Sequence, residues 1–269
     1  MNWTIGFITE EQFKEHVRQT IKKYGVKLKP YDLEKFNSNL IDPIKVVFDK
    51  AVYGWSWNDL ISSEVFRQRD KANTNDIGYF HQRIFQYIDG CHVPENGTEG
   101  GWDVIVKKRY AVSEGNTVNK IYVEMKNKHN TMNSSASGKT YMKMQNQLLH
   151  DDDCVCFLVE AIAKRHQNVV WKTTLDGQKV GHMRIRRVSL DVFYEIVTGV
   201  PDAFYQICKV LPDVVKDVLT DNVGIPHDTV FEELQAKAKE LYGNTDDFSI
   251  MMAIYMLGFG TYTGFGDNR

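Results

Sequence analysis

Two acidic residues and a lysine in the middle of the chain have the types and spacing that suit cleavage of a phosphodiester bond. Glu124 and Lys126 lie two residues apart in the segment NKIYVEMK, so in an extended chain both side chains point to the same face. The other face of this segment is apolar, and charges beside buried residues are costly unless they are paired or bound to a metal. Asp103 lies earlier, in the similar segment GWDVIVKKRY. If the two segments pair as a hairpin, the three side chains converge at neighbouring positions.

Such a cluster suits metal-dependent hydrolysis. Two carboxylates supply hard oxygen ligands for Mg²⁺, which also binds phosphate oxygens. The metal polarises the phosphoryl group and lowers the pKa of a bound water, while the lysine ammonium orients that water and offsets the charge that grows on the phosphate. The alternative is a structural salt bridge between Glu124 and Lys126, in a module that binds nucleic acid without cutting it.

An aspartate on one strand followed by Glu-x-Lys on the next resembles the PD-(D/E)xK nuclease superfamily, although Trp102 stands where the superfamily's name has proline. Further segments of the chain resemble a family of type II restriction endonucleases that cut within GGNCC: GFITEEQFKEHV, NLIDPIK, IGYFHQ, VEMKNKHNTMNSSASGKTYMKMQ and RIRRVSLDVFYEIVTG. The resemblance implies a bacterial, Mg²⁺-dependent homodimer that cuts both DNA strands. It also implies that Asp103 and Glu124 bind the metal and that Lys126 is the catalytic lysine.

Two residues of the expected N-terminal helices are further candidates for the catalytic site. Glu64 has the place of an additional metal-site carboxylate taken from an upstream helix, and its alternative is an exposed helical glutamate. Gln82, together with His81, lies in the expected helix just before the Asp103 segment and could approach the site. For His81 the alternative is a partly buried histidine with a satisfied ring.

Two groups of polar residues are candidates for contacts with DNA, because asparagine, lysine, serine and arginine read base edges and bind phosphates. The first directly follows the Glu-x-Lys segment, and its alternative is an ordinary flexible loop. The second lies on a late strand, where the alternative is a solvated edge. The two groups are Lys128, His129, Asn130, Asn133, Ser134, Ser135 and Lys139, and then Arg184, Arg186 and Arg187.

Charge is distributed unevenly along the chain. The formal net charge is −2, yet residues 101–190 hold 15 Lys and Arg against 8 Asp and Glu, whereas residues 191–269 hold 5 against 13. A basic central segment beside an acidic tail favours a local phosphate-binding surface, and a solvated face of no functional meaning is the alternative. Three consecutive aspartates, residues 151–153, are interpreted as a turn because their side chains point apart.

The elements that must position these residues change from helices to strands and back. Residues 1–90 carry the spacing and caps of about four helices, with caps expected at Thr9, Asp42 and Ser56 and at Asn75 or Asp76. Residues 100–190 carry the patterns of several strands and of one short helix at 141–150, and a hairpin turn is expected at Asp176. Residues 191–269 are again helical, with caps at Ser189, Asp202 and Asp228. We expect a single α/β nuclease domain over residues 1–269, with a PD-(D/E)xK restriction-endonuclease-like core: a mixed sheet flanked by helices, with helical N- and C-terminal extensions.

Composition agrees with an intracellular globular protein. Hydrophobic residues make up 42% of the 269 residues, and the longest apolar run is too short to span a bilayer. The four cysteines show no pattern of a disulfide framework or a zinc site. With this composition, the resemblance to the restriction endonucleases implies a cytoplasmic bacterial enzyme of type II, a Mg²⁺-dependent homodimer without membrane association. It would act on double-stranded DNA at a palindromic, G/C-rich site and leave 5′-phosphates. Within the same class, a repair or junction-cutting nuclease is the rival.

Overall fold

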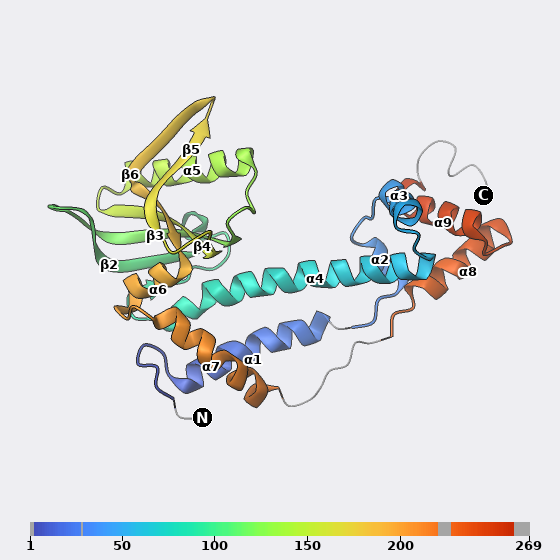
Figure 1. Cartoon of the computed structure of the whole chain (residues 1–269), viewed down its shortest axis with the longest axis horizontal. Coiled ribbons are helices and arrows are strands. Elements are labelled where there is room, and N and C mark those ends of the chain that lie inside the picture. Colours follow the sequence, from blue (N-terminus) through green and yellow to red (C-terminus); the bar gives the residue numbers. More distant parts are fainter. Residues whose placement is uncertain (1–2, 28, 220–226, 261–269) are drawn as a thin grey trace. The chain divides into compact units, whose positions relative to one another are not determined.

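The computed structural model describes residues 3–27, 29–219 and 227–260. The chain divides into two compact units: unit 1 comprises Met1–Ile21 and Asp76–Asp221, and unit 2 comprises Lys22–Asn75 and Asn222–Arg269. Unit 1 contains the sheet, and unit 2 is helical (Figure 1). Within the described ranges, no helix is long and apolar enough to cross a membrane.

A mixed six-stranded sheet forms the centre of unit 1, in the order β1-β2-β3-β4-β6-β5. The pairs β1/β2, β2/β3 and β5/β6 are antiparallel, whereas β3/β4 and β4/β6 are parallel. The strand bounds are Cys91–His92 (β1), Val104–Ser113 (β2), Asn116–Lys128 (β3), Cys154–Ile162 (β4), Asn168–Leu175 (β5) and Gln178–Ser189 (β6). This arrangement confirms the expected α/β class, with a mixed sheet flanked by helices.

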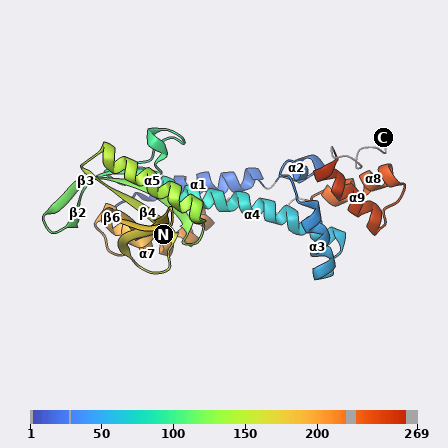
Figure 2. The ribbon, with the colours of Figure 1, turned by 90° about the horizontal axis from the view of Figure 1, so that it is seen from above.

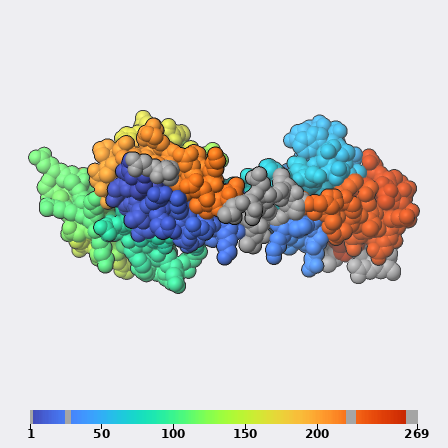
Figure 3. Space-filling view, turned by 90° about the horizontal axis from the view of Figure 1, so that it is seen from below, coloured from blue at the N-terminus to red at the C-terminus, as the bar shows by residue number. Residues whose placement is uncertain are grey.

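Both expected hairpins are present. The β2–β3 turn contains Gly115 with a φ of 72°, and Asp176 and Gly177 form the β5–β6 turn with φ values of 48° and 79°. Positive φ at both central residues twists a short turn to match the strands that it joins. The tip of the β2–β3 hairpin projects from unit 1, as Figure 3 shows in green.

The parallel pairing of β3 with β4 requires a crossover, and helix α5 (Ser134–His150) provides it. Figures 1 and 2 show α5 lying along one face of the sheet. Its apolar stripe of Tyr141, Met144 and Leu148 is buried in one cluster with Trp102 and Leu158, which confirms the expectation that the stripe is core. The helix begins at Ser134 rather than near Tyr141, because Asn133 caps it by accepting a hydrogen bond from the Ala136 amide at 2.9 Å.

The opposite face of the sheet carries a larger core. Buried residues of β2, β3 and β4 pack there against Phe13 and Val17 of α1 (Glu10–Lys27), Phe85 of the short 3₁₀ helix Ile84–Tyr87, and Phe193 of α6 (Leu190–Thr198). Helix α7 (Ala203–Val218) completes this layer with Ile207. The beginning of α1 lies beside α7 (Figure 3), and Lys14 of α1 forms an ion pair with Asp217 of α7 at 3.4 Å.

Unit 2 has its own helical core. It contains α2 (Leu33–Asn37), α3 (Pro43–Tyr53), α8 (Val230–Tyr242), α9 (Asp247–Phe259) and the first part of α4 (Trp57–Arg83), and it buries Phe36, Leu234 and Ile254 together. Asp228 does not cap a helix as expected: Thr229 holds the N-cap position of α8, and Asp228 instead accepts two hydrogen bonds from Arg69.

Several of the expected helix starts are correct, but besides those of α5 and α8 one more boundary is wrong. Thr9 and Gln12 exchange reciprocal hydrogen bonds at the start of α1, and Asp42 caps α3 through the Ile44 amide. The helices expected to begin at Ser56 and near Asp76 are a single helix, α4, of 27 residues. Asp76 is buried in its middle, so its preference for caps is overridden by tertiary packing.

Candidate active site

Asp103, just before β2, and Glu124 of β3 lie close enough at one end of the hairpin for the charge of Glu124 to act on Asp103. The register pairs Val104 with Val123, and the Asp103 amide donates to the Val123 carbonyl at 2.9 Å. Asp103 precedes β2 rather than lying within it, because Gly100 and Gly101 turn the chain with φ values of 75° and 69° just before Trp102. Its carboxylate Oδ2 accepts a hydrogen bond from the Met125 amide at 2.6 Å.

Glu124 binds two lysines, one at each carboxylate oxygen. Lys126 Nζ lies 2.7 Å from Oε1, and Lys143 Nζ of α5 lies 2.8 Å from Oε2. Only 14% of the Glu124 side chain is exposed, so little water competes with these contacts. The expected cluster of Glu124 and Lys126 is therefore present, and a third charged residue joins it.

The two carboxyl groups respond to their surroundings in opposite directions. Burial, reinforced by the charge of Glu124, raises the pKa of Asp103 to about 6, although the Met125 amide and the two lysines oppose this shift. Burial also acts to raise the pKa of Glu124, but Lys126 and Lys143 outweigh it and hold that pKa below the ordinary value. At neutral pH the site therefore contains two carboxylates, and the repulsion between them contributes to the raised pKa of Asp103.

Lys143 was not predicted from the sequence. Besides Glu124, its ammonium contacts the Gly101 carbonyl at 2.7 Å and lies 4.2 Å from the centre of the Trp102 ring. The sequence places Lys143 beside the buried stripe of a helix, and that position alone does not distinguish it from a solvated lysine. The parallel pairing of β3 with β4, which sets α5 over the Glu124 face, is the signal that could have identified it.

The two candidates from the N-terminal helices, Gln82 and Glu64, belong to different units of the chain. Gln82, which is buried, donates from Nε2 to the Asp103 carbonyl at 3.1 Å and so contacts the backbone of the site. Glu64 belongs to unit 2, where its carboxylate accepts hydrogen bonds from Arg67 and Gln68. Burial lowers the pKa of His81. A Cβ added at Gly78 would lie 3.0 Å from the Asn127 side-chain oxygen. Helix α4 therefore packs directly against β3, the strand that carries Lys126.

The polar stretch after β3 is half loop and half helix. Lys128 and Asn130 are exposed before α5, while Ser134, Ser135 and Lys139 are exposed in its first two turns. Exposed hydroxyls, amides and ammonium groups at the start of a helix suit contacts with phosphates. As a DNA contact, this stretch stays a prediction.

Two members of the expected DNA-contact groups instead meet at a buried glutamate. Glu160 at the end of β4 is 1% exposed, and it accepts hydrogen bonds from Arg187 Nε at 2.8 Å and His129 Nδ1 at 2.9 Å. Arg187 also donates to the His129 carbonyl at 3.0 Å. This contact set is here called the Glu160 staple. It fixes the chain directly after β3 against the ends of β4 and β6. Glu160 was not predicted, since it reads as one polar residue in an apolar strand.

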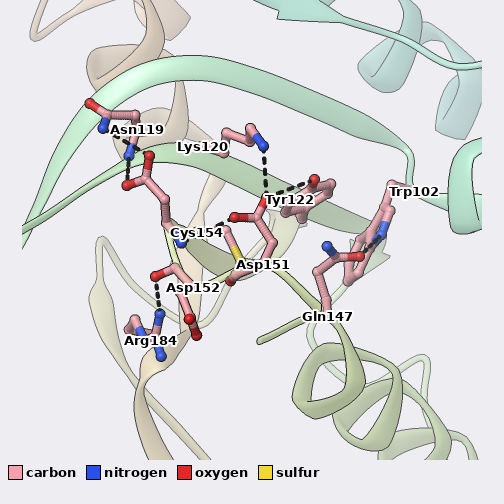
Figure 4. Close-up of polar contacts among 10 residues, drawn as sticks. Trp102, Asn119, Lys120, Tyr122, Gln147, Asp151, Asp152, Cys154 and Arg184 are labelled. Atoms are coloured by element: carbon pink, nitrogen blue, oxygen red, sulfur yellow. Dashed lines mark hydrogen bonds and ion pairs between the residues drawn. The ribbon is translucent and has the colours of Figure 1, made fainter. Parts of the chain in front are cut away.

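The remaining arginines of β6 also contact protein groups. Arg184 donates to the Asp152 carbonyl at 2.6 Å, and Arg186 bonds to the side chain and carbonyl of Asn168. Figure 4 shows Arg184 at the turn of residues 151–153, where Asp151 accepts from Lys120 and Tyr122 at 2.9 and 3.2 Å. Figure 4 also shows Trp102, which donates to Gln147 of α5 at 3.1 Å.

The donor set at Asp103 and Glu124 fits a hard divalent cation. Within the part of the chain that the structure describes, three or more His, Cys, Asp or Glu side chains do not gather at any one point. Mg²⁺ commonly uses one or two carboxylates together with water and phosphate oxygens. The carboxylate repulsion that raises the pKa of Asp103 is the kind that a bound cation relieves.

Comparison with known proteins matches the chain to one family of restriction enzymes. A family model described as Eco47II restriction endonuclease matches residues 5–220. The type II restriction enzyme Sau96I of Staphylococcus aureus is 30% identical over 224 residues, which cover 80% of this chain and 81% of that protein. The type II restriction enzyme Eco47II of Escherichia coli is 26% identical over 229 residues, or 82% and 90% of the two chains. The family match includes the whole sheet of unit 1.

Proposed function

The chain belongs to the Eco47II family of type II restriction endonucleases, and we propose that it uses Asp103, Glu124 and Lys126 to cut both strands of a short palindromic DNA site. Family membership makes it a site-specific endonuclease, and so disfavours the non-catalytic module and the repair nuclease. The observation that carries the assignment of the site is the convergence of Asp103, Glu124 and Lys126 at the end of the β2–β3 hairpin. We propose that this hairpin is the centre of a PD-(D/E)xK core.

We further propose that Asp103 and Glu124 hold Mg²⁺. The bound cation supplies charge that polarises the scissile phosphoryl group. The Met125 amide fixes one oxygen of Asp103, and Glu124 lies close enough for its charge to act on this carboxyl group. Lys126 lies within reach of the same carboxylate, and its ammonium can orient an attacking water and offset the charge that develops on the phosphate. Release of the 3′ oxygen then leaves 5′-phosphates on the products.

The DNA substrate is proposed to be a G/C-rich site of the GGNCC or GGWCC type. The residues that support this are the exposed polar groups at the start of α5 and the arginines of β6, since arginine binds guanine through two hydrogen bonds in the major groove. Arg186 and Arg187 are bound to Asn168 and Glu160 in this structure. Their contact with bases would require them to exchange these partners, whereas Lys128, Asn130 and Lys139 are exposed.

Digestion of sequenced plasmid DNA tests the proposal. With Mg²⁺ we expect discrete fragments whose ends carry 5′-phosphates and map to one palindromic G/C-rich sequence, and without Mg²⁺ we expect no cleavage. The matched controls are Lys126→Met, which removes the catalytic ammonium, and Lys179→Met, which removes an exposed lysine at the tip of the β5–β6 hairpin. Random fragments, or cutting by the Lys126→Met protein at the wild-type rate, would contradict it.

A further inference from the structure

Lys143 links the two chain segments that carry the catalytic carboxylates. Its ammonium binds the Glu124 carboxylate on β3 at 2.8 Å and the Gly101 carbonyl at 2.7 Å, two residues before Asp103. These are the strand and the turn whose relative position decides the separation of Asp103 from Glu124. One side chain from α5 therefore touches both.

The Gly101–Asp103 turn has few other supports on its α5 side. Gly100 and Gly101 both adopt positive φ, a conformation that the sequence permits but does not enforce. The Trp102 ring packs under the Lys143 ammonium at 4.2 Å, and its indole N–H donates to Gln147 one helical turn later. Helix α5 thus contacts the turn through two residues, Lys143 and Gln147. Of these two residues, Lys143 is the one that also binds Glu124.

We propose that Lys143 is a positioning residue of the catalytic centre, which fixes the Asp103 turn relative to Glu124. This inference rests on the proposed function, because it matters for cleavage only if those carboxylates are catalytic. A lysine that acted only as a surface counter-ion would have high solvent exposure and one partner. Lys143 has three partners, and 29% of its side chain is exposed.

Amide hydrogen exchange of the protein alone tests the positioning role without any cleavage. The Asp103 amide is bonded to Val123, and the Met125 amide is bonded to Asp103 Oδ2, so both report whether the turn stays on the strand. In Lys143→Met we expect faster exchange at these two amides and unchanged exchange in β4, for example at Val155 and Phe157. Lys179→Met is the matched control and should change neither.

Cleavage gives the second readout. For Lys143→Met at saturating cognate DNA we expect kcat to fall about 100-fold, as for a displacement of catalytic groups by about 1 Å. The Kd for the same DNA in Ca²⁺ should stay within about twofold, because no DNA contact is removed. Lys143→Arg keeps the charge and the donor and should restore most of kcat and of the slow exchange.

Each other result overturns the proposal. A wild-type kcat in Lys143→Met would show that the turn holds its position without this lysine. Loss of kcat with unchanged exchange would make Lys143 a group that acts on the substrate itself, and faster exchange throughout the sheet would make it a general stability residue. Failure of the proposed function is distinct, because it would appear as a lack of site-specific cleavage by the wild-type protein, while the exchange comparison would still stand.

Discussion

At the scale of single residues, the site shifts the pKa values of two similar carboxyl groups in opposite directions. Both Asp103 and Glu124 are largely buried, yet only Glu124 binds two ammonium groups directly, so its pKa is lowered while that of Asp103 is raised to about 6. Neighbouring charges decide the direction of a shift when burial alone would move both the same way. Asp103 is consequently the carboxylate that gains most when positive charge enters the site.

Asp103→Asn should raise the free energy of unfolding of the metal-free protein at neutral pH. The pKa of Asp103 is raised from 3.8 to about 6, so the folded protein binds this proton more tightly than the unfolded chain does. The ionised carboxylate therefore destabilises the fold increasingly as the pH rises from 3.8 to about 6. Asparagine does not ionise, and its side-chain oxygen can still accept from the Met125 amide.

Urea unfolding in EDTA at several pH values measures this effect. The advantage of Asp103→Asn over wild type should be smallest at the acidic end of that window and reach its full size above pH 6. Glu124→Gln is the informative contrast, because the pKa of Glu124 is lowered and its charge stabilises the fold. An advantage of Asp103→Asn that did not depend on pH would contradict the assigned cause.

Asp103→Ala and Glu124→Ala should each abolish cleavage, because each removes an oxygen ligand that water does not replace at the same geometry. Supercoiled plasmid in Mg²⁺ provides the assay, and circular dichroism establishes that each variant is folded. Glu64→Ala is the matched carboxylate deletion outside unit 1. If a folded Asp103→Ala or Glu124→Ala protein cut near the wild-type rate, that residue would not be a metal ligand.

At the scale of elements, the Glu160 staple shows how strand ends are fixed around the site. Arg187→Met should lower the free energy of unfolding by about 3 kcal/mol, because it removes a partner from a carboxylate that is 1% exposed. Arg184→Met should cost less than about 1 kcal/mol, since its guanidinium bonds to the carbonyl of Asp152 on an exposed turn.

Denaturant unfolding of the two variants separates them, and the double variant Glu160→Gln/Arg187→Met provides the control. It should recover part of the loss, because a neutral amide is less costly to bury than an unpaired carboxylate. Equal losses for Arg184→Met and Arg187→Met would show that the staple has no special role.

The same scale explains what could be predicted from the sequence. Alternation of apolar residues located β2 and β3, a continuous apolar run located β4, and turn chemistry located Asp176 and Gly177, because these signals act over a few residues. The join of two expected helices into α4 was missed, since packing around Asp76 overrides its local preference. Lys143 and Glu160 were missed because their partners lie on elements distant in sequence, and only the parallel order of strands brings them together.

At the scale of the whole molecule, the single domain expected for residues 1–269 stays a prediction. The two compact units each bury their own hydrophobic cluster, and two of the three boundaries between them fall within α1 and α4. The three residues proposed to carry out cleavage, Asp103, Glu124 and Lys126, belong to unit 1, whereas Glu64 belongs to unit 2. Unit 2 also exposes an apolar row on α3, formed by Ile44, Phe48 and Val52 at four-residue spacing. The sequence pattern alone would assign that row to a core.

Assembly follows from the symmetry of the substrate. One Asp103–Glu124–Lys126 site cuts one strand, whereas a palindromic site presents the same bond on two strands related by a two-fold axis. We therefore expect a C2 homodimer, with sedimentation of about twice 31.1 kDa on cognate DNA. Mixing wild-type with Lys126→Met subunits should give heterodimers that nick one strand of a supercoiled plasmid, because only one of their two sites is active. A monomer on cognate DNA, or mixtures with no more nicked product than wild type alone, would mean that one chain makes both cuts.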